Sequence, residues 1–220
     1  ETEIDPIASS GTTGTMSFTP RDKSDWRTQI LGGYRIQLLQ KFGEPPTESD
    51  LNEELYVPWP THPDGHNGLF RAAHYINKYL ARESENHFYP MYDTAADTDV
   101  MFLAARLRAA QSRGDGRVNV PQSLLDRRSE IEAMERDRPV KAARWVQALV
   151  SQLNGKRVFL FGPAPLLYDA AKAGLAQGKM CNFAPNSSIQ VGLGGKGTAI
   201  ADDWEEVIMR FLNYSGRNNY

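Results

Sequence analysis

The stretch "KRVFLFGPAPLLYDAAKAGLAQG", residues 156–178, contains the clearest boundary between two elements in this chain of 220 residues. Its first part, 156–163, is a short apolar run bounded by Gly and Pro, which is typical of a buried strand. Its second part, 164–178, has the apolar spacing of an amphipathic helix. A strand followed directly by a helix is the repeating unit of α/β proteins, so this stretch predicts that class.

The rest of the chain repeats the pattern. Helix-like spacing recurs at 20–43, 69–82, 97–113 and 201–213, and strand candidates lie at 3–9, 16–19, 54–60, 87–93 and 187–197. Strands that alternate with helices indicate an α/β fold with a mostly parallel sheet flanked by helices. The long charged stretch at 123–155 also has helical spacing, and Pro139 within it predicts two helices rather than one.

Composition restricts the function classes. A hydrophobic content of 40% and a charged content of 24% are ordinary for a globular domain. A net charge of −2 provides no basic field for nucleic acid, and the apolar runs are too short to span a bilayer. Because Cys181 is the single cysteine, no internal disulfide can form, and we expect a cytoplasmic protein with a buried, inert thiol. His62, His74 and His87 show no metal-ligand spacing with Cys181, so a zinc site is not expected.

The first candidate site is the stretch "SSGTTG" between two predicted strands. Glycines let a backbone approach a phosphate closely, and hydroxyl groups add hydrogen-bond donors. The stretch is not a Walker A loop, because no Gly-Lys-Ser/Thr follows at the required spacing. A polar hairpin turn is the alternative, although six such residues in succession exceed what a hairpin needs. The residues are Ser9, Ser10, Gly11, Thr12, Thr13 and Gly14.

Two further loops are candidates. In "GLGGKG", residues 192–197, Gly194 and Gly195 would let a flat ring lie against the backbone, and Lys196 would meet an anion. This loop does not fit the dinucleotide-binding glycine pattern. In "DGHNG", residues 64–68, His66 and Asn67 precede a predicted helix. A lone loop histidine is more often a solvated residue than a catalytic one.

Taken together and in order, these pieces resemble the adenylate-forming superfamily of acyl-CoA synthetases and phenylacetate-CoA ligases, and most closely its acyl-protein synthetase branch. The likeness spans nearly the whole chain. The matching positions are "SSGTTG" at 9–14, Ser17, "PRD" at 20–22, His66-Asn67, Tyr89-Pro90, Gly162-Pro163 and the approximate glycine loop at 192–197. The charged stretch 114–138 is interpreted as a helical insertion. The residues Thr15-Met16-Ser17 depart from the Pro-Lys that many members carry after the loop.

The resemblance implies that the chain is part of the large N-terminal domain, 1–220, of a ligase. Such an enzyme joins a carboxylic acid, here most simply a fatty acid, to ATP with Mg²⁺, and passes the acyl group to a thiol on a protein cysteine or coenzyme A. Residues 9–14 would hold the β- and γ-phosphates, and Gly194, Gly195 and Lys196 would line the adenine pocket. His66, the implied catalytic residue, and Asn67 would lie at the acyl entrance. No metal ligand is implied within the chain, and a reductase is a further expected partner.

The chain begins at Glu1 and stops at "NYSGRNNY", so we expect a piece of a longer protein. The mobile C-terminal lid domain with its lysine would lie beyond Tyr220, and we expect the piece alone to be inactive. Two other functions stay open. One is a non-catalytic nucleotide- or acyl-binding module. The other is an α/β interaction domain in which 122–153 forms a partner-binding helical arm.

Overall fold

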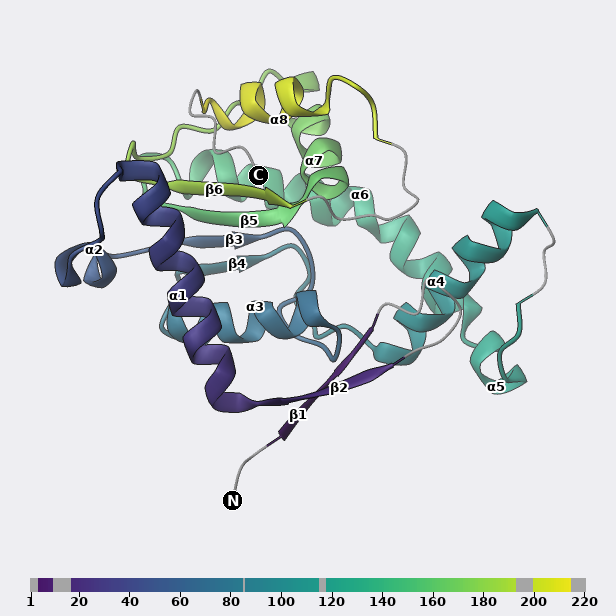
Figure 1. Ribbon diagram of the computed structural model, residues 1–220. Coiled ribbons are helices and arrows are strands. Elements are labelled where there is room, and N and C mark those ends of the chain that lie inside the picture. Colours follow the sequence, from purple (N-terminus) through teal and green to yellow (C-terminus); the bar gives the residue numbers. More distant parts are fainter. Residues whose placement is uncertain (1–3, 10–16, 85, 115–117, 193–199, 215–220) are drawn as a thin grey trace.

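Four short strands run parallel at the centre of the molecule. The computed structural model describes residues 4–9, 17–84, 86–114, 118–192 and 200–214. In it β5 (Phe159–Pro163) pairs with β6 (Ser188–Gly192), and β3 (Val57–Trp59) pairs with β4 (Phe88–Pro90), both in parallel. An isolated parallel bridge between Tyr56 and Val158 joins the two pairs, which lie side by side in Figure 1. The α/β class is therefore confirmed, but the parallel strands form two small pairs and no large sheet within the described residues.

Alternate side chains of these strands enter two separate cores. Val158 and Leu160 pack with one cluster of buried residues, whereas Phe159 between them packs with the other. This alternation is what the period of two along a strand dictates when both faces are covered. The first core is closed by α6 (Arg128–Ser151), α7 (Ala164–Ala176) and α8 (Trp204–Leu212). The second is closed by α1 (Lys23–Phe42) and α3 (Gly68–Tyr79) on the opposite face (Figure 1).

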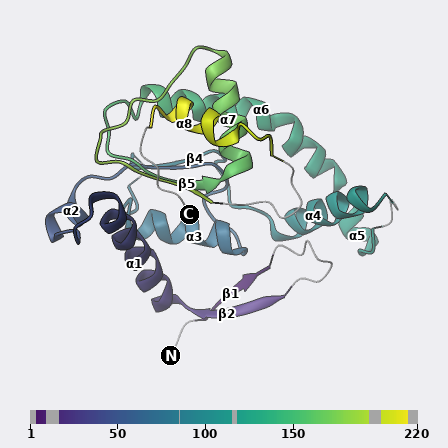
Figure 2. The ribbon, with the colours of Figure 1, turned by 45° about the horizontal axis from the view of Figure 1, so that its top comes forward.

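An antiparallel hairpin precedes this assembly. Its strands β1 (Ile4–Ala8) and β2 (Phe18–Asp22) pair from Ile4–Asp22 to Ala8–Phe18, as the two strand candidates at the start of the chain predict. Figure 2 shows the hairpin on the side of the strands that carries α3. Three further helices complete the described part: α2 (Glu48–Asn52), α4 (Thr98–Arg113) and α5 (Gln122–Leu125).

The prediction of two helices divided at Pro139 is wrong, because α6 continues through Pro139 from Arg128 to Ser151. A proline inside a helix removes one backbone hydrogen bond and costs about 3 kcal/mol. The carbonyl that loses its hydrogen bond lies four residues before Pro139. Because Pro139 is exposed, water can hydrogen-bond to that carbonyl instead. Contacts on both sides offset the cost: Arg138 Nη2 donates to Asp169 on α7 over 2.7 Å, and Trp145 and Leu149 are buried in the first core.

Packing of α7 on α8 provides the first prediction. A Cβ added to Gly174 of α7 would overlap the ring of Phe211, which is 2% exposed. We expect Gly174→Ala to destabilise the fold by about 1–3 kcal/mol through overpacking, despite the higher helix propensity of alanine. The matched control is Gly33→Ala in α1, where an added Cβ has nothing within 4 Å. That variant should gain up to about 1 kcal/mol in urea unfolding. Equal effects of the two substitutions would contradict the packing.

Candidate functional site

The hairpin closes beneath the "SSGTTG" stretch. The Ser9 N–H donates to the Ser17 carbonyl over 2.8 Å, and the Ser17 N–H donates to Ser9 Oγ over 2.9 Å. Ser10, Gly11, Thr12, Thr13 and Gly14 lie outside the described residues. Seven residues, 10–16, separate the closed ends, whereas the commonest hairpin turns need two to five. The hydroxyl of Ser9 still has its own O–H to donate, because it only accepts in the contact with Ser17.

Ser9 lies next to the predicted His66–Asn67 pair, although the two are far apart in sequence. The Ala8 N–H donates to the His66 carbonyl over 2.6 Å, and Ala8 forms an isolated parallel bridge with Asn67. Asn67 is also the N-cap of α3, where its Oδ1 accepts the Phe70 N–H over 2.9 Å. The cap uses only the oxygen of the amide, so both Nδ2 hydrogens stay usable as donors.

A cavity of about 150 Å³ lies between β1, the start of α3 and α4. Its polar lining residues are Ser9, His66 and Asn67, together with Thr98 and Arg108 of α4. The remaining lining is apolar and consists of Ala8, Phe70, Ala96, Met101, Phe102 and Ala105. None of these described lining residues is acidic. The cavity is therefore rich in donors at its rim, apolar at its floor and suited to an anion with an apolar body.

Sequence reasoning missed the contribution of α4. It identified 97–113 only as an amphipathic helix, of which Val100, Leu103 and Ala104 are buried. The cavity is lined by a second face of the same helix, at Thr98, Met101, Phe102, Ala105 and Arg108. Their spacing of 3, 4, 7 and 10 residues is the helical signal that would have revealed this face.

The carboxylate of Asp5 fixes the hairpin to α3 below the cavity. It is buried with Arg71, whose Nε lies 3.2 Å from Asp5 Oδ2 and whose Nη1 lies 3.1 Å from Asp64 Oδ1. The Tyr75 hydroxyl donates to the same Asp5 oxygen over 3.2 Å. Burial, together with the adjacent Asp5 charge, raises the pKa of Tyr75 to about 12, so this hydroxyl stays a neutral donor. The register between the hairpin and α3 therefore depends on a charge pair with little access to water.

The tautomer of His66 follows from its neighbour. Arg71 Nη2 lies 3.4 Å from His66 Nδ1, and a guanidinium can only donate. Nδ1 is therefore the acceptor, and in the neutral ring the proton is on Nε2. The His66 side chain is exposed, so its Nε2–H is a donor available at the rim of the cavity. This arrangement suits binding of an oxyanion better than removal of a proton.

The third predicted loop begins at the same edge of the parallel strands. Gly194, Gly195 and Lys196 lie outside the described residues, but β6 ends at Gly192 and leads into them. Since β3 and β6 run in the same direction, the loop after β6 and the loop that carries His66 leave the strands at their carboxyl ends. Ligands of open α/β sheets bind at this edge.

His62 has a structural role, and His74 and His87 lie beside the carboxylates of Asp64 and Glu54, at 3.2 and 3.0 Å. His62 is buried, its Nδ1 lies 2.9 Å from the Thr94 carbonyl, and its ring stacks on Tyr92 with centroids 4.2 Å apart. Burial lowers the pKa of His62, which keeps the ring neutral. In the ranges that the structure describes, no group of three His, Cys, Asp or Glu side chains is placed to hold a metal ion.

Comparison with known proteins gave no match to a family model, to a curated protein or to a solved structure. The resemblance to adenylate-forming enzymes therefore stays an interpretation of the motifs. Among the helices of the described residues, none combines the length and the apolar character needed to cross a bilayer.

A double-mutant cycle tests the attachment of the hairpin. Arg71→Met leaves the Asp5 carboxylate buried without its partner, so we expect a loss of about 3–5 kcal/mol in urea unfolding. Asp5→Asn alone and the double variant complete the cycle, and the two single losses together should exceed the loss in the double variant by more than about 1 kcal/mol, which is the coupling between the two charges. The control pair, Arg128 and Glu132 on α6, is mostly exposed at 3.7 Å, and its coupling should stay below about 0.5 kcal/mol. Similar couplings in the two cycles would contradict a buried pair.

Thiol reactivity tests the prediction of an inert Cys181. This residue is 1% exposed, and burial raises the pKa of its thiol to about 12. At pH 8 we expect the native chain to react with Ellman's reagent at least ~100-fold more slowly than the urea-unfolded chain. The adjacent Met180 is 52% exposed, so Met180→Cys in a Cys181→Ser background should react rapidly while folded. Fast native labelling of Cys181 would contradict its burial.

Proposed function

We propose that this chain is the nucleotide- and acid-binding part of a ligase that activates a carboxylic acid with ATP. The reaction would give an acyl-adenylate and pyrophosphate, and the acyl group would then pass to a thiol of a protein or of coenzyme A. One observation carries the proposal: the end of the "SSGTTG" hairpin and the His66–Asn67 pair, which are more than fifty residues apart in sequence, line a single cavity.

The chemistry of the cavity fits this reaction. A carboxylate is already a nucleophile, so adenylation needs alignment and relief of charge more than a general base. Ser9, His66 and Asn67 all offer hydrogen-bond donors at the rim, and none of the described lining residues is acidic. His66 Nε2–H would donate to an oxygen of the acid or of its adenylate, as the catalytic residue that the resemblance implies.

The size of the cavity favours the acid as its occupant. A space of about 150 Å³ matches a protein cavity known to bind benzene and lies below the 300 Å³ or more of most ligand pockets. A nucleotide would therefore lie over the two loops that the motifs mark, 9–14 and 192–197. Mg²⁺ would bind to the phosphates of the nucleotide and neutralise their charge. The cavity favours an acid with a compact apolar body over the long fatty chain that the resemblance suggests.

The rival interpretation as an interaction domain places partner binding on 122–153. The second half of that segment is part of the first core through Trp145, Val146 and Leu149. This leaves the charged half before Pro139 as the surface that a partner would contact. A module that only binds a nucleotide or an acid would have the same cavity, and it would differ from a ligase only in lacking turnover.

Thermal unfolding with ligands tests the proposal. Mg²⁺-ATP at a hundredfold excess over its Kd should stabilise the chain by about 2.7 kcal/mol, and Thr12→Val with Thr13→Val should remove the effect. Thr28→Val is the control, because Thr28 is an exposed residue on α1 away from the loop. Ala105→Leu, which fills the cavity, should abolish stabilisation by benzoate and leave that by Mg²⁺-ATP. Absence of any nucleotide effect would contradict the proposal. Since this part alone is expected to bind without turnover, pyrophosphate release in the presence of an acid and a thiol would exclude a purely binding module.

A further inference from the structure

A second pocket lies at the opposite end of α3. It has a volume of about 310 Å³ and is bounded by α1, by α2 and by the C-terminal end of α3. It shares no residue with the cavity at Ser9 and His66. Because α3 starts at the carboxyl ends of the parallel strands, this pocket lies at their amino ends, outside the proposed catalytic edge.

The lining of this pocket combines an apolar floor with two guanidinium groups. Leu31, Leu51, Leu55 and Leu80 supply the floor. Arg35 of α1 and Arg82, just after α3, supply the charges, and Glu48 is the one acidic residue among the described lining. Neither arginine forms an ion pair with a carboxylate in the part of the chain that the structure describes. Unpaired guanidinium groups beside apolar surface are suited to an anion that also has an apolar part.

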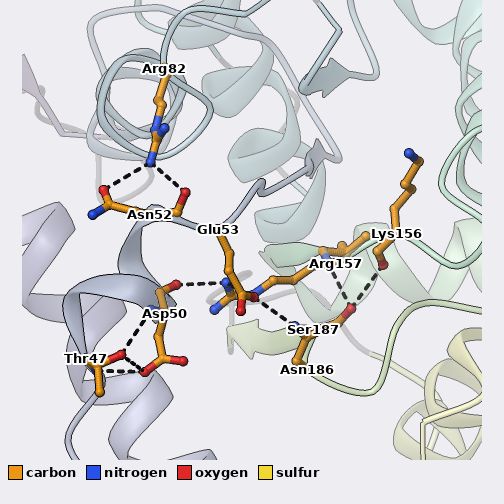
Figure 3. A network of polar contacts seen from close by, with 10 residues as sticks. Thr47, Asp50, Asn52, Glu53, Arg82, Lys156, Arg157, Asn186 and Ser187 are labelled. Carbon is orange, nitrogen blue, oxygen red and sulfur yellow. Dashed lines mark hydrogen bonds and ion pairs between the residues drawn. The ribbon is translucent and has the colours of Figure 1, made fainter.

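The backbone at Arg82 is held in an unfavourable conformation. Arg82 and Glu83 both have φ of 56°, in the left-handed region that residues with a side chain seldom adopt. Such positions cost of order 1–3 kcal/mol each and are concentrated at ligand clamps and active sites. Figure 3 shows the result: the Arg82 guanidinium points at the end of α2, where Nη2 lies 3.2 Å from the Asn52 carbonyl and 3.4 Å from Asn52 Oδ1.

This contact leaves most of the guanidinium available. Nη2 is the only donor of Arg82 that meets Asn52, so Nε–H and the Nη1 hydrogens can still donate, each to a single oxygen of a carboxylate or phosphate. The contact with Asn52 also orients the side chain before any ligand arrives, which reduces the entropy lost on binding.

We propose that this pocket binds an amphipathic anion, namely a compact apolar group that carries one phosphate or carboxylate. The apolar group lies on the leucine floor, and the anionic group lies between Arg35 and Arg82. The site is independent of the proposed ligase activity.

Calorimetric titration with two probes, phenyl phosphate and benzoate, tests the site and tells phosphate from carboxylate. All titrations use the Ala105→Leu background, so that binding in the first cavity does not contribute. At least one probe should bind about tenfold or more tightly than inorganic phosphate, which has no apolar group, and than benzyl alcohol, which has no charge. Arg35→Gln and Arg82→Gln should each weaken it about tenfold.

The controls separate a binding role from a structural one. Arg27→Gln removes an exposed arginine of α1 that does not line the pocket, and it should leave the affinity within about twofold. Glu83→Gly relieves the backbone strain at position 83 and keeps Arg82, so binding should persist. If Arg82→Gln also disturbs α2, the loss of affinity in Arg35→Gln still tests the binding role of the site. The proposal is overturned if neither probe binds with a Kd below about 10 mM, or if the affinity is unchanged by Arg35→Gln.

Discussion

Two backbone hydrogen bonds join Tyr56 to the beginning of β5: the Tyr56 N–H donates to the Arg157 carbonyl and the Phe159 N–H donates to the Tyr56 carbonyl, both over 2.9 Å. On its other side the same segment accepts the Ser188 N–H at the Val158 carbonyl over 2.7 Å. Residues 157–159 are therefore paired on both sides and must lie at the centre. Their alternate side chains then divide between the two cores, so every helix that covers the strands takes its position from this pairing.

Outside the strands, arginine side chains attach α2 to the rest of the fold. Helix α2 is five residues long and buries none of them completely, and its Leu51 packs only partly buried against the second core, so packing alone holds it weakly. Arg157, which is 7% exposed, donates to the Asp50 carbonyl over 2.8 Å and pairs with Glu53 at 2.6 Å, while Arg82 reaches Asn52 from the other side (Figure 3). Cations at the carbonyl end of a helix are favourable, and removing one would take away a hydrogen-bond partner from the carbonyl and carboxylate groups at the end of α2.

Sequence periodicity predicts elements that bury one face, and it succeeds for β5 and α7 because their burial is local and regular. It fails at Pro139, where the penalty of the proline is offset by contacts with Asp169 and with the first core, which are remote in sequence. The loops 9–14 and 64–68 were recognisable as candidate sites from their residue types. The contact between Ala8, just before the first loop, and His66 was not, because it joins a strand to a loop remote in sequence beside the Asp5–Arg71 pair. The left-handed Arg82 carries no sequence signal either, since glycine is what that conformation ordinarily selects.

Helix α3 connects the two pockets mechanically. Its cap, Asn67, lines the first cavity, and Leu80 at its other end lines the second. Its twelve residues span about 18 Å. Ala73 and Ile76 hold it against the strands because they are buried in the second core. The pockets share no lining residue, so a ligand in one affects the other only to the extent that it prefers a shifted position of α3. Any such effect must be reciprocal: an anion at Arg82 that strengthened binding at His66 would itself bind more tightly, by the same factor, when the first cavity is filled.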